Sequence, residues 1–145
     1  MISVKHLSKK FGDVTVLKDI NLDIKEKEVV VIIGPSGSGK STILRCLNHL
    51  ETPSGGEIFF HGKPVDDKEL KLTDYRARVG MVFQSFNLFD NMTVLKNCMI
   101  GQTKVLGKSR AEAKETAMKY LEKVGMEPYI NAKPSQLSGG QKQRV

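Results

Sequence analysis

The sequence is poor in cysteine, aromatic residues and long apolar runs. It has two Cys, no Trp, six Phe and three Tyr in 145 residues. Cys46 and Cys98 stand in unrelated surroundings, which argues against a disulfide framework or a zinc site, and we expect both to be small buried hydrophobes. No apolar run approaches the ~20 residues of a membrane helix, and the first residues lack the apolar stretch of a signal peptide. A cytosolic protein is therefore predicted.

The remaining composition is that of a globular domain. Hydrophobic residues make up 39% and charged residues 27% of the chain, and the length suits one compact domain. The net charge is +7, from 23 Lys plus Arg against 16 Asp plus Glu. Such a domain could bind nucleic acid, an anionic membrane surface or nucleotide phosphates. The basic residues are scattered, however, and are densest at Lys5–Lys10 and Lys142–Arg144, which favours an ordinary solvated surface.

The N-terminal third is predicted to form strands. Apolar residues fall largely on even positions from Val14 to Ile24, the period-two pattern of a half-buried strand. The continuous apolar run Val29–Ile33 predicts a strand covered on both faces, as in a parallel α/β sheet. Glu57–His61 and Val79–Phe83 are predicted as two further strands.

One helix is predicted before Gln84, and the chain after Gln84 is predicted to be mainly helical. The first begins near Lys40, with Ile43, Leu44, Leu47 and Leu50 on one stripe. Thr93 is predicted to cap a helix over Val94–Leu106, closed by Gly107. A capping box at Ser109 opens the next helix, which ends at Gly125 and carries its apolar face on Ala113, Ala117, Tyr120, Leu121 and Val124.

Residues Gly34–Ser41, with the sequence Gly-Pro-Ser-Gly-Ser-Gly-Lys-Ser, match the phosphate-binding pattern G-x-x-x-x-G-K-[ST] at each fixed position. Small residues let consecutive backbone N–H groups curl around a polyanion, and the following helix presents its positive N-terminus. Lys40 is placed to reach the β- and γ-phosphates, and the Ser41 hydroxyl is placed to bind Mg²⁺. The sequence motif therefore predicts a binding site for a nucleoside triphosphate.

A second glycine motif, Leu137-Ser138-Gly139-Gly140-Gln141, lies near the end of the chain. A hydroxyl and two glycines at a helix start make another candidate anion site. Together with the first loop, this motif resembles the signature sequence of the nucleotide-binding domain of ATP-binding cassette (ABC) transporters. The resemblance covers the whole chain, and segments such as Val82–Phe89 are similar to the importers of polar amino acids.

The resemblance implies roles for residues outside the two motifs. Phe11 would stack on adenine, with Val16 on the ribose side, and Gln84 would be the Q-loop glutamine that approaches Mg²⁺ and the attacking water. The implied cofactors are ATP and Mg²⁺, with Ser41 and Gln84 at the metal and Lys40 and Gln84 as the catalytic residues. The implied nucleotide-binding residues are Phe11, Val16, Gly34, Pro35, Ser36, Gly37, Ser38, Gly39, Lys40, Ser41, Thr42, Ser138, Gly139, Gly140 and Gln141.

The implied fold is α/β: a P-loop NTPase core with an N-terminal antiparallel β region and a helical subdomain, truncated before the Walker B strand. We expect the incomplete core over residues 1–86 and the helical subdomain over residues 87–145. The family's Asp-Glu strand and switch histidine are not found in the sequence. We therefore expect ATP hydrolysis by the complete subunit and not by this chain alone. Lys27 stands where the family usually has Gly, and Asp90-Asn91 replaces a common Pro-His.

The function implied is that of the ATP-binding subunit of an importer for polar amino acids, peripheral on the cytoplasmic face of the membrane. Its expected partners are a second subunit in a head-to-tail homodimer, permease subunits that contact Gln84–Met92 and, indirectly, an extracytoplasmic amino-acid-binding protein. No nucleic acid partner is expected. Alternatives are a soluble ABC ATPase, a DNA-repair ATPase, which would need coiled-coil heptads between Gln84 and Leu137, and a non-catalytic nucleotide-binding module.

Overall fold

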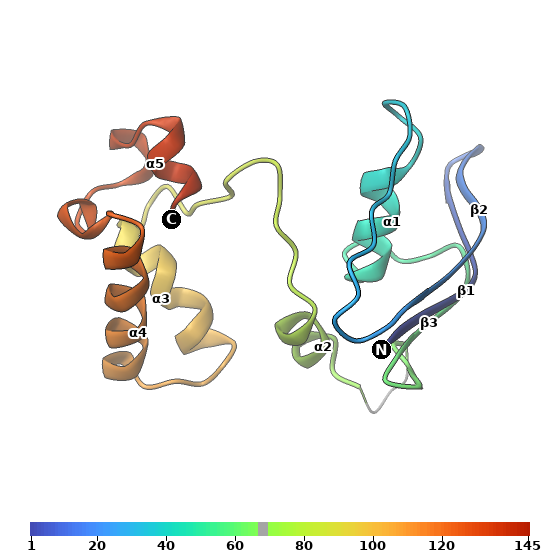
Figure 1. Cartoon of the computed structure of the whole chain (residues 1–145), viewed down its shortest axis with the longest axis horizontal. Helices are drawn as coiled ribbons and strands as arrows, with labels where there is room; N and C mark the ends of the chain where they lie inside the picture. The colour runs from blue at the N-terminus through green and yellow to red at the C-terminus, as the bar shows by residue number, and fades with distance from the viewer. Residues whose placement is uncertain (67–69) are drawn as a thin grey trace. The chain divides into compact units, whose positions relative to one another are not determined.

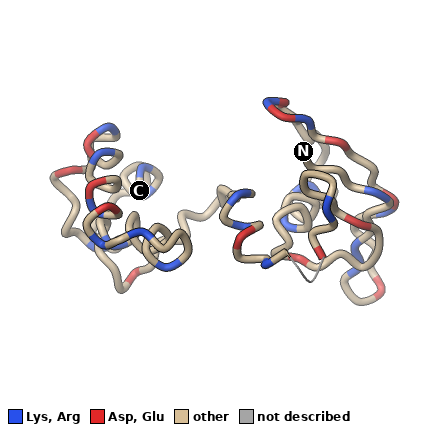
Figure 2. Tube along the Cα trace, turned by 90° about the horizontal axis from the view of Figure 1, so that it is seen from below, with Lys and Arg blue, Asp and Glu red and all other residues tan. Residues whose placement is uncertain are grey.

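The computed structural model describes residues 1–66 and 70–145. These residues form two compact units, Met1–Met81 and Val82–Val145, each with its own hydrophobic core. Basic and acidic residues are interspersed along the chain in both units (Figure 2). The helices in the described part of the chain include none long and apolar enough to cross a membrane.

The first unit is built on a four-stranded antiparallel sheet with the strand order β2-β1-β3-β4 (Figure 1). The strands are β1 (Ile2–Phe11), β2 (Val14–Ile24), β3 (Gly55–Phe60) and β4 (Lys63–Pro64). Helix α1 (Lys40–Leu47) contributes to the same core as the sheet. The buried residues of this core are Val4, Leu7, Leu17, Ile43, Cys46, Leu47, Ile58, Val65 and Tyr75. The predicted antiparallel β region is confirmed.

A bulge interrupts the predicted alternation of β2. Val16, Ile20, Leu22 and Ile24 are half-buried, as the even positions predict, but the fully buried residue is Leu17 at an odd position. The pairing with β1 shifts register between Leu17 and Ile20, where Asp19 has a φ of 51°. An extra residue in one strand exchanges the two faces, because side chains alternate with a period of two.

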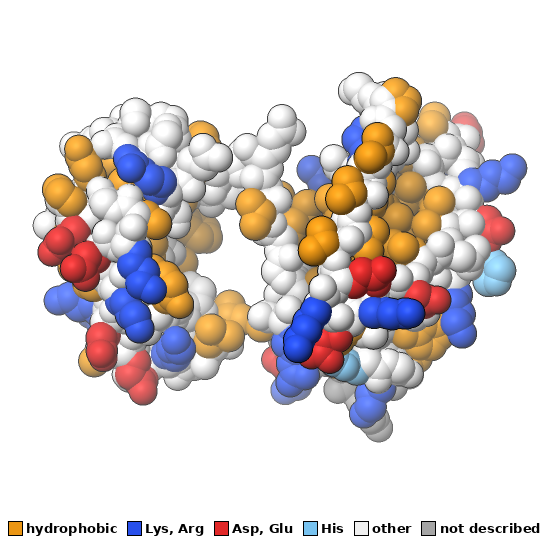
Figure 3. Space-filling view, in the orientation of Figure 1, with side chains coloured by type: hydrophobic (Ala, Val, Ile, Leu, Met, Phe, Trp, Pro, Cys, Tyr) orange, Lys and Arg blue, Asp and Glu red, His pale blue; other side chains and the backbone are white. Residues whose placement is uncertain are grey.

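Two predicted strands are not formed. Val29–Ile33 and Val79–Phe83 have no strand structure, and Val29, Ile33 and Val82 are 87%, 90% and 98% exposed. The space-filling view shows hydrophobic side chains along the segment that leads to α1 (Figure 3). A strand of a parallel sheet needs neighbouring strands that supply its hydrogen bonds, and no strand among the described residues pairs with either segment. The predicted burial of Val29–Ile33 on both faces is therefore wrong for this chain.

Helix α2 (Leu72–Arg78) has no counterpart among the predicted elements. Its Tyr75 is fully buried, and the phenol O–H donates to the carbonyl oxygen of Leu47 at the end of α1. Burial raises the pKa of Tyr75 to about 12. Arg76 donates to the carbonyl oxygen of His49 just beyond α1. The short helix therefore satisfies the last carbonyl group of α1 and one in the turn that follows it.

A tight turn connects β2 to the exposed segment. Lys27 has a φ of 63°, in the left-handed region that favours glycine. The turn is closed by the Glu28 N–H, which donates to the Lys25 carbonyl oxygen over 3.3 Å, and by the Lys25 N–H, which donates to the Glu28 carboxylate over 2.8 Å. This backbone conformation gives a physical reason why the resembling family usually has Gly at this position.

The second unit is helical. Helices α3 (Val94–Lys104) and α4 (Arg110–Lys123) lie side by side (Figure 1), followed by the short helices η1 (Glu127–Tyr129), η2 (Pro134–Gln136) and α5 (Gly139–Gln143). The predicted caps at Thr93, Ser109 and Gly125 are confirmed, but α3 ends at Lys104 with Val105 as its C-cap, before the predicted end at Leu106 and Gly107. Thr93 accepts from the Lys96 N–H, Ser109 forms its capping box with Glu112, and Gly125 has a φ of 66° after α4.

The core of this unit differs in part from the predicted stripe. Ala113, Ala117 and Leu121 of α4 are buried as predicted, but Tyr120 is 61% exposed and Val124, the C-cap residue, is 38% exposed. The second core cluster consists of Val94, Leu121, Met126 and Leu137. Leu137 thereby ties the second glycine motif to the packed interior of the unit. In the first unit, Leu44 of α1 and Leu50 just beyond it are likewise exposed rather than buried, and Cys46 of α1 is in the core.

Candidate nucleotide-binding site

The phosphate-loop sequence folds into a curl that ends at the N-terminus of α1. The Lys40 ammonium lies inside this curl and donates to the carbonyl oxygens of Gly34 (2.8 Å) and Pro35 (2.6 Å). The Ser38 N–H donates to the Pro35 carbonyl oxygen over 3.3 Å. These bonds place a positive charge beside the backbone that the sequence predicts to face the phosphates. An ammonium has three donors, so one more remains for an anion.

The first turn of α1 adds to this positive site. Its N-cap is Gly39, in the left-handed conformation with a φ of 87°. Gly39 has no side chain with which to cap the helix, so the N–H groups of the first turn are open to another acceptor. Ser41 lies exposed in that turn, which includes no acidic residue. The helix therefore presents N–H groups, a hydroxyl and an ammonium in one place.

Strand β2 approaches the loop closely at Gly39. A Cβ atom on this glycine would lie 2.9 Å from Leu17 Cδ2, 3.2 Å from Val16 Cγ1 and 3.2 Å from the Val16 carbonyl oxygen. The structure thus brings Val16, predicted from the resemblance, against the phosphate loop. Leu17, which the sequence analysis did not single out, shares the contact and is buried.

Phe11 ends β1 on the same hairpin. It pairs with Val14 across the turn, and 46% of its side chain is exposed. The Lys9 ammonium lies 4.7 Å from the centroid of its ring. The hairpin therefore carries a half-exposed aromatic ring at its tip and, at Val16, the contact with the phosphate loop.

Gln84 and the residues of the second glycine motif belong to the second unit. Gln84 is exposed in the non-helical segment before α3. Ser138 is the N-cap of α5: its Oγ accepts from the Gln141 N–H over 3.3 Å, and its own N–H donates to Gln141 Oε1 over 2.8 Å. Gly139 and Gly140 are exposed. The predicted helix start is confirmed, and the Ser138 hydroxyl keeps its proton for donation to an anion.

The donor set at the phosphate loop fits a magnesium ion that is held mainly by phosphate. Among residues 1–66 and 70–145, no group of three or more His, Cys, Asp or Glu is arranged to hold a metal. Mg²⁺ keeps several waters and takes one or two protein oxygens together with substrate phosphates. The exposed Ser41 hydroxyl can supply one such oxygen.

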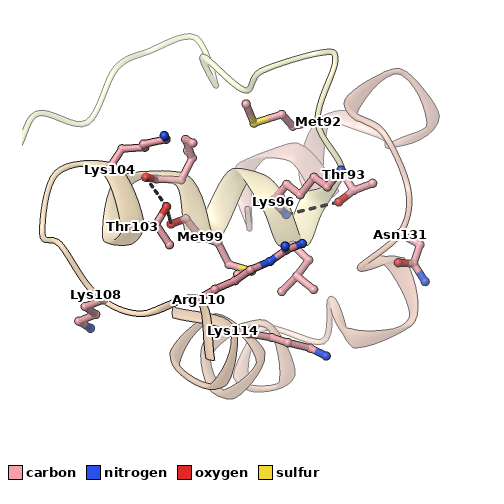
Figure 4. Close-up of a pocket in the computed structure, with 12 residues that line it drawn as sticks. Met92, Thr93, Lys96, Met99, Thr103, Lys104, Lys108, Arg110, Lys114 and Asn131 are labelled. Atoms are coloured by element: carbon pink, nitrogen blue, oxygen red, sulfur yellow. Dashed lines mark hydrogen bonds between the residues drawn. The ribbon is translucent and has the colours of Figure 1, made fainter. Parts of the chain in front are cut away.

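The second unit also has a groove. Of its lining residues, the sequence analysis named only Met92 as part of a contact region. The groove has a volume of about 850 Å³ and lies along α3 and the start of α4 (Figure 4). Its apolar lining comes from Met92, Leu95, Met99 and Ile100, and its other described lining residues include five cations and no carboxylate. The cations are Lys96, Lys104, Lys108, Arg110 and Lys114. The groove therefore offers an apolar floor within a positive rim.

Comparison with known proteins identifies the class to which this site belongs. The family model described as ABC transporter matches residues 17–145. The chain therefore belongs to the ABC transporter family, whose cassettes bind ATP.

The most informative relatives are importer subunits. The chain is 57% identical to the glutamine transport ATP-binding protein GlnQ of Geobacillus stearothermophilus and 48% identical to the glutamate/aspartate import ATP-binding protein GltL of Escherichia coli. Each alignment covers 100% of this chain and 60% of the relative. The chain thus spans three fifths of the length of these relatives.

A solved structure described as the dimeric form of MJ0796, a bacterial ABC transporter cassette, is similar to the chain. The TM-score is 0.83 at 37% sequence identity, over 99% of this chain and 66% of that one. The same cassette in a dimeric post-hydrolysis state bound to ADP and Pi gives a TM-score of 0.80. These similarities confirm the predicted P-loop NTPase fold class.

Proposed function

We propose that the complete protein is the ATP-hydrolysing subunit of an ABC importer for polar amino acids. The observation that carries this proposal is the phosphate loop, in which the Lys40 ammonium lies within the curl at the start of α1. The identity to GlnQ and GltL supports polar amino acids as the transported class. The protein is then peripheral on the cytoplasmic face of the membrane.

In the proposed mechanism, the chain positions ATP and stabilises its charge. Lys40 and the first-turn N–H groups of α1 hold the phosphates, Ser41 supplies an oxygen to Mg²⁺, and the Phe11 ring stacks on adenine. When bound there, Mg²⁺ would supply positive charge that neutralises the phosphoryl oxygens. Gln84 orients the attacking water in this scheme.

Two subunits are proposed to close head to tail on two ATP molecules. The exposed hydroxyl of Ser138 and the N–H groups of Gly139 and Gly140 then contact the γ-phosphate held by the opposite subunit. ATP favours the closed state because ADP lacks the phosphate that both subunits contact. The dimeric state of the similar cassette supports this arrangement.

The permease subunit is proposed to contact Gln84–Met92 and to extend into the adjoining groove. The groove's apolar floor and five cations favour a segment with both apolar and acidic side chains. The charge reversal Lys96→Glu should then reduce copurification with permease subunits, whereas Lys123→Glu on α4, outside the groove lining, should leave it unchanged. Equal copurification of both variants would argue against the groove.

Nucleotide binding is tested by titrating the chain with ATP in a calorimeter. Lys40→Ala should weaken ATP binding by at least an order of magnitude, because hydrogen bonds to charged groups contribute about 1.5–3 kcal/mol each. Lys10→Ala, on β1 and outside the loop, serves as the control for loss of one positive charge. Unchanged affinity in Lys40→Ala would show that the loop is not the phosphate site.

Hydrolysis is tested separately by measuring phosphate release. We propose that turnover needs groups outside these 145 residues. A chain extended with the remaining part of the Geobacillus relative should therefore hydrolyse ATP, and the chain alone should not. Comparable turnover by both proteins would place the catalytic groups within residues 1–145.

A further inference from the structure

Lys9 is a cation in an unusually well-defined position. Its side chain is 12% exposed, although lysine is normally a solvated residue. The ammonium lies 4.7 Å from the centroid of the Phe11 ring, donates to the Thr52 carbonyl oxygen over 2.8 Å and pairs with Glu51 Oε2 over 3.1 Å. Three separate groups therefore fix one flexible side chain.

These contacts join the tip of the hairpin to the segment that follows the phosphate-loop helix. Glu51 and Thr52 come shortly after α1, whose first residue is Lys40. Two further hydrogen bonds strengthen the same junction: the Ser54 N–H donates to the Ser8 carbonyl oxygen over 2.8 Å, and the Lys10 N–H donates to the Ser54 side-chain Oγ over 3.0 Å. The end of β1 is thus fixed to the chain that leaves α1.

The Lys9 ammonium lies over the Phe11 ring and leaves part of that ring accessible to a ligand. An aromatic ring has two faces, and a cation over one of them is attracted by the ring quadrupole. Phe11 is 46% exposed, so part of the ring remains open to a ligand. A ring that is already held loses less freedom when a base stacks on it.

We infer that Lys9 is a positioning residue for the nucleotide base: it holds one face of Phe11 and leaves the other face for a purine. The inference rests on the proposed stacking role of Phe11. If Lys9 acts in this way, the affinity for the base depends on Lys9, whereas the affinity for the phosphates is independent of Lys9.

The chain offers a matched control on the same strand. The Lys5 ammonium lies 5.2 Å from the centroid of the Phe59 ring. Phe59 belongs to β3 and pairs with Ser3 and Pro64. Lys5→Met therefore removes a comparable cation–aromatic contact from β1 without touching Phe11.

The test measures the affinity of the 145-residue chain for ATP and for inorganic triphosphate, which has no base. Lys9→Met should weaken ATP about three- to tenfold, the range of a cation–π contact in a partly desolvated site, and leave triphosphate binding unchanged. Lys9→Arg keeps a cation over the ring and should bind ATP within about twofold of the wild type. Lys5→Met should behave as the wild type with both ligands.

A double-mutant cycle identifies the ring as the mediator. In the Phe11→Ala background, Lys9→Met should have no further effect on ATP affinity. An equal loss of ATP and triphosphate affinity in Lys9→Met, a failure of Lys9→Arg to restore binding, or an additive loss in the double variant would each overturn the inference. Failure of the proposed function is distinguishable, because the wild type would then not bind ATP or Phe11→Ala alone would leave ATP affinity unchanged.

Discussion

Replacing Gly39 by alanine should destabilise the first unit more than any other alanine substitution in the phosphate loop. Gly39 has a φ of 87°, and a Cβ atom there would lie 2.9 Å from Leu17 Cδ2 and 3.2 Å from the Val16 carbonyl oxygen. The left-handed conformation costs an alanine about 1–2 kcal/mol. Crowding in a packed site adds about 1–3 kcal/mol, because the carbonyl oxygen belongs to a paired strand and cannot rotate away. The expected loss is therefore about 2–5 kcal/mol.

Gly37 separates the two contributions. It has a φ of 79°, but a Cβ atom there would meet nothing within 4 Å. Gly37→Ala should therefore cost only the backbone term of about 1–2 kcal/mol. Val16→Ala in the Gly39→Ala background removes the methyl group that lies 3.2 Å from the new Cβ atom, so the double variant should lose less than the sum of the single losses.

The assay is equilibrium urea denaturation followed by circular dichroism, which gives the free energy of unfolding by linear extrapolation. The wild type and the two single glycine variants are compared under the same conditions. If Gly39→Ala is no more destabilising than Gly37→Ala, the close approach of β2 to the phosphate loop is not present in solution, and the placement of Val16 at the site falls with it.

Three further predictions concern the first unit. Gly56→Ala should reduce the free energy of unfolding by about 3 kcal/mol or more, because its φ is 84° and a Cβ atom would lie 2.6 Å from the Leu7 backbone nitrogen; Gly62→Ala, with a φ of 79° and open space, is the control in the same urea assay. Lys27→Gly should raise the melting temperature, since relief of the left-handed conformation is worth about 1 kcal/mol; an unchanged or lower value would contradict that conformation. The raised pKa of Tyr75 means that the fold favours its neutral form. The contribution of Tyr75 to the free energy of unfolding should therefore be fully present below pH 10, the ordinary pKa of tyrosine. It should fall by on the order of 1–2 kcal/mol between pH 10 and about pH 12. Tyr75→Phe should remove this part of the pH dependence, and an identical profile in both proteins would refute the assignment.

The N-terminal starts of the helices are the features that the sequence predicted best. Thr93 and Ser109 cap the helices that were predicted to begin there, and the predicted helix start at Ser138 is also formed, with Ser138 as its N-cap. Capping depends on backbone and side-chain groups within one turn, so the information lies within a few neighbouring residues. The phosphate loop belongs to the same class, because its closing bonds join residues at most six positions apart.

The failures concern properties that depend on distant parts of the chain. The apolar run Val29–Ile33 predicts burial, but burial needs another surface, and strand structure needs a paired neighbour. The alternation in β2 could not reveal the bulge at Asp19, which is held by the His6 ring nitrogen 2.7 Å from the carboxylate. Hydrogen bonding by His6 also lowers the pKa of this carboxyl. Helix α2 was missed because it is only seven residues long and has no capping side chain.

The candidate site combines both kinds of information. The Lys40 curl is local, whereas the contacts that orient it reach across the unit: Leu17 and Val16 meet Gly39 from β2, and Lys9 meets Thr52 from β1. Neither set of contacts involves Val29–Ile33, although that run leads directly into the loop. The geometry of the phosphate loop is therefore held by the hairpin and α1. It follows that loss of a hairpin contact such as Val16–Gly39 should disturb the loop more than substitution of an exposed valine in the run before it.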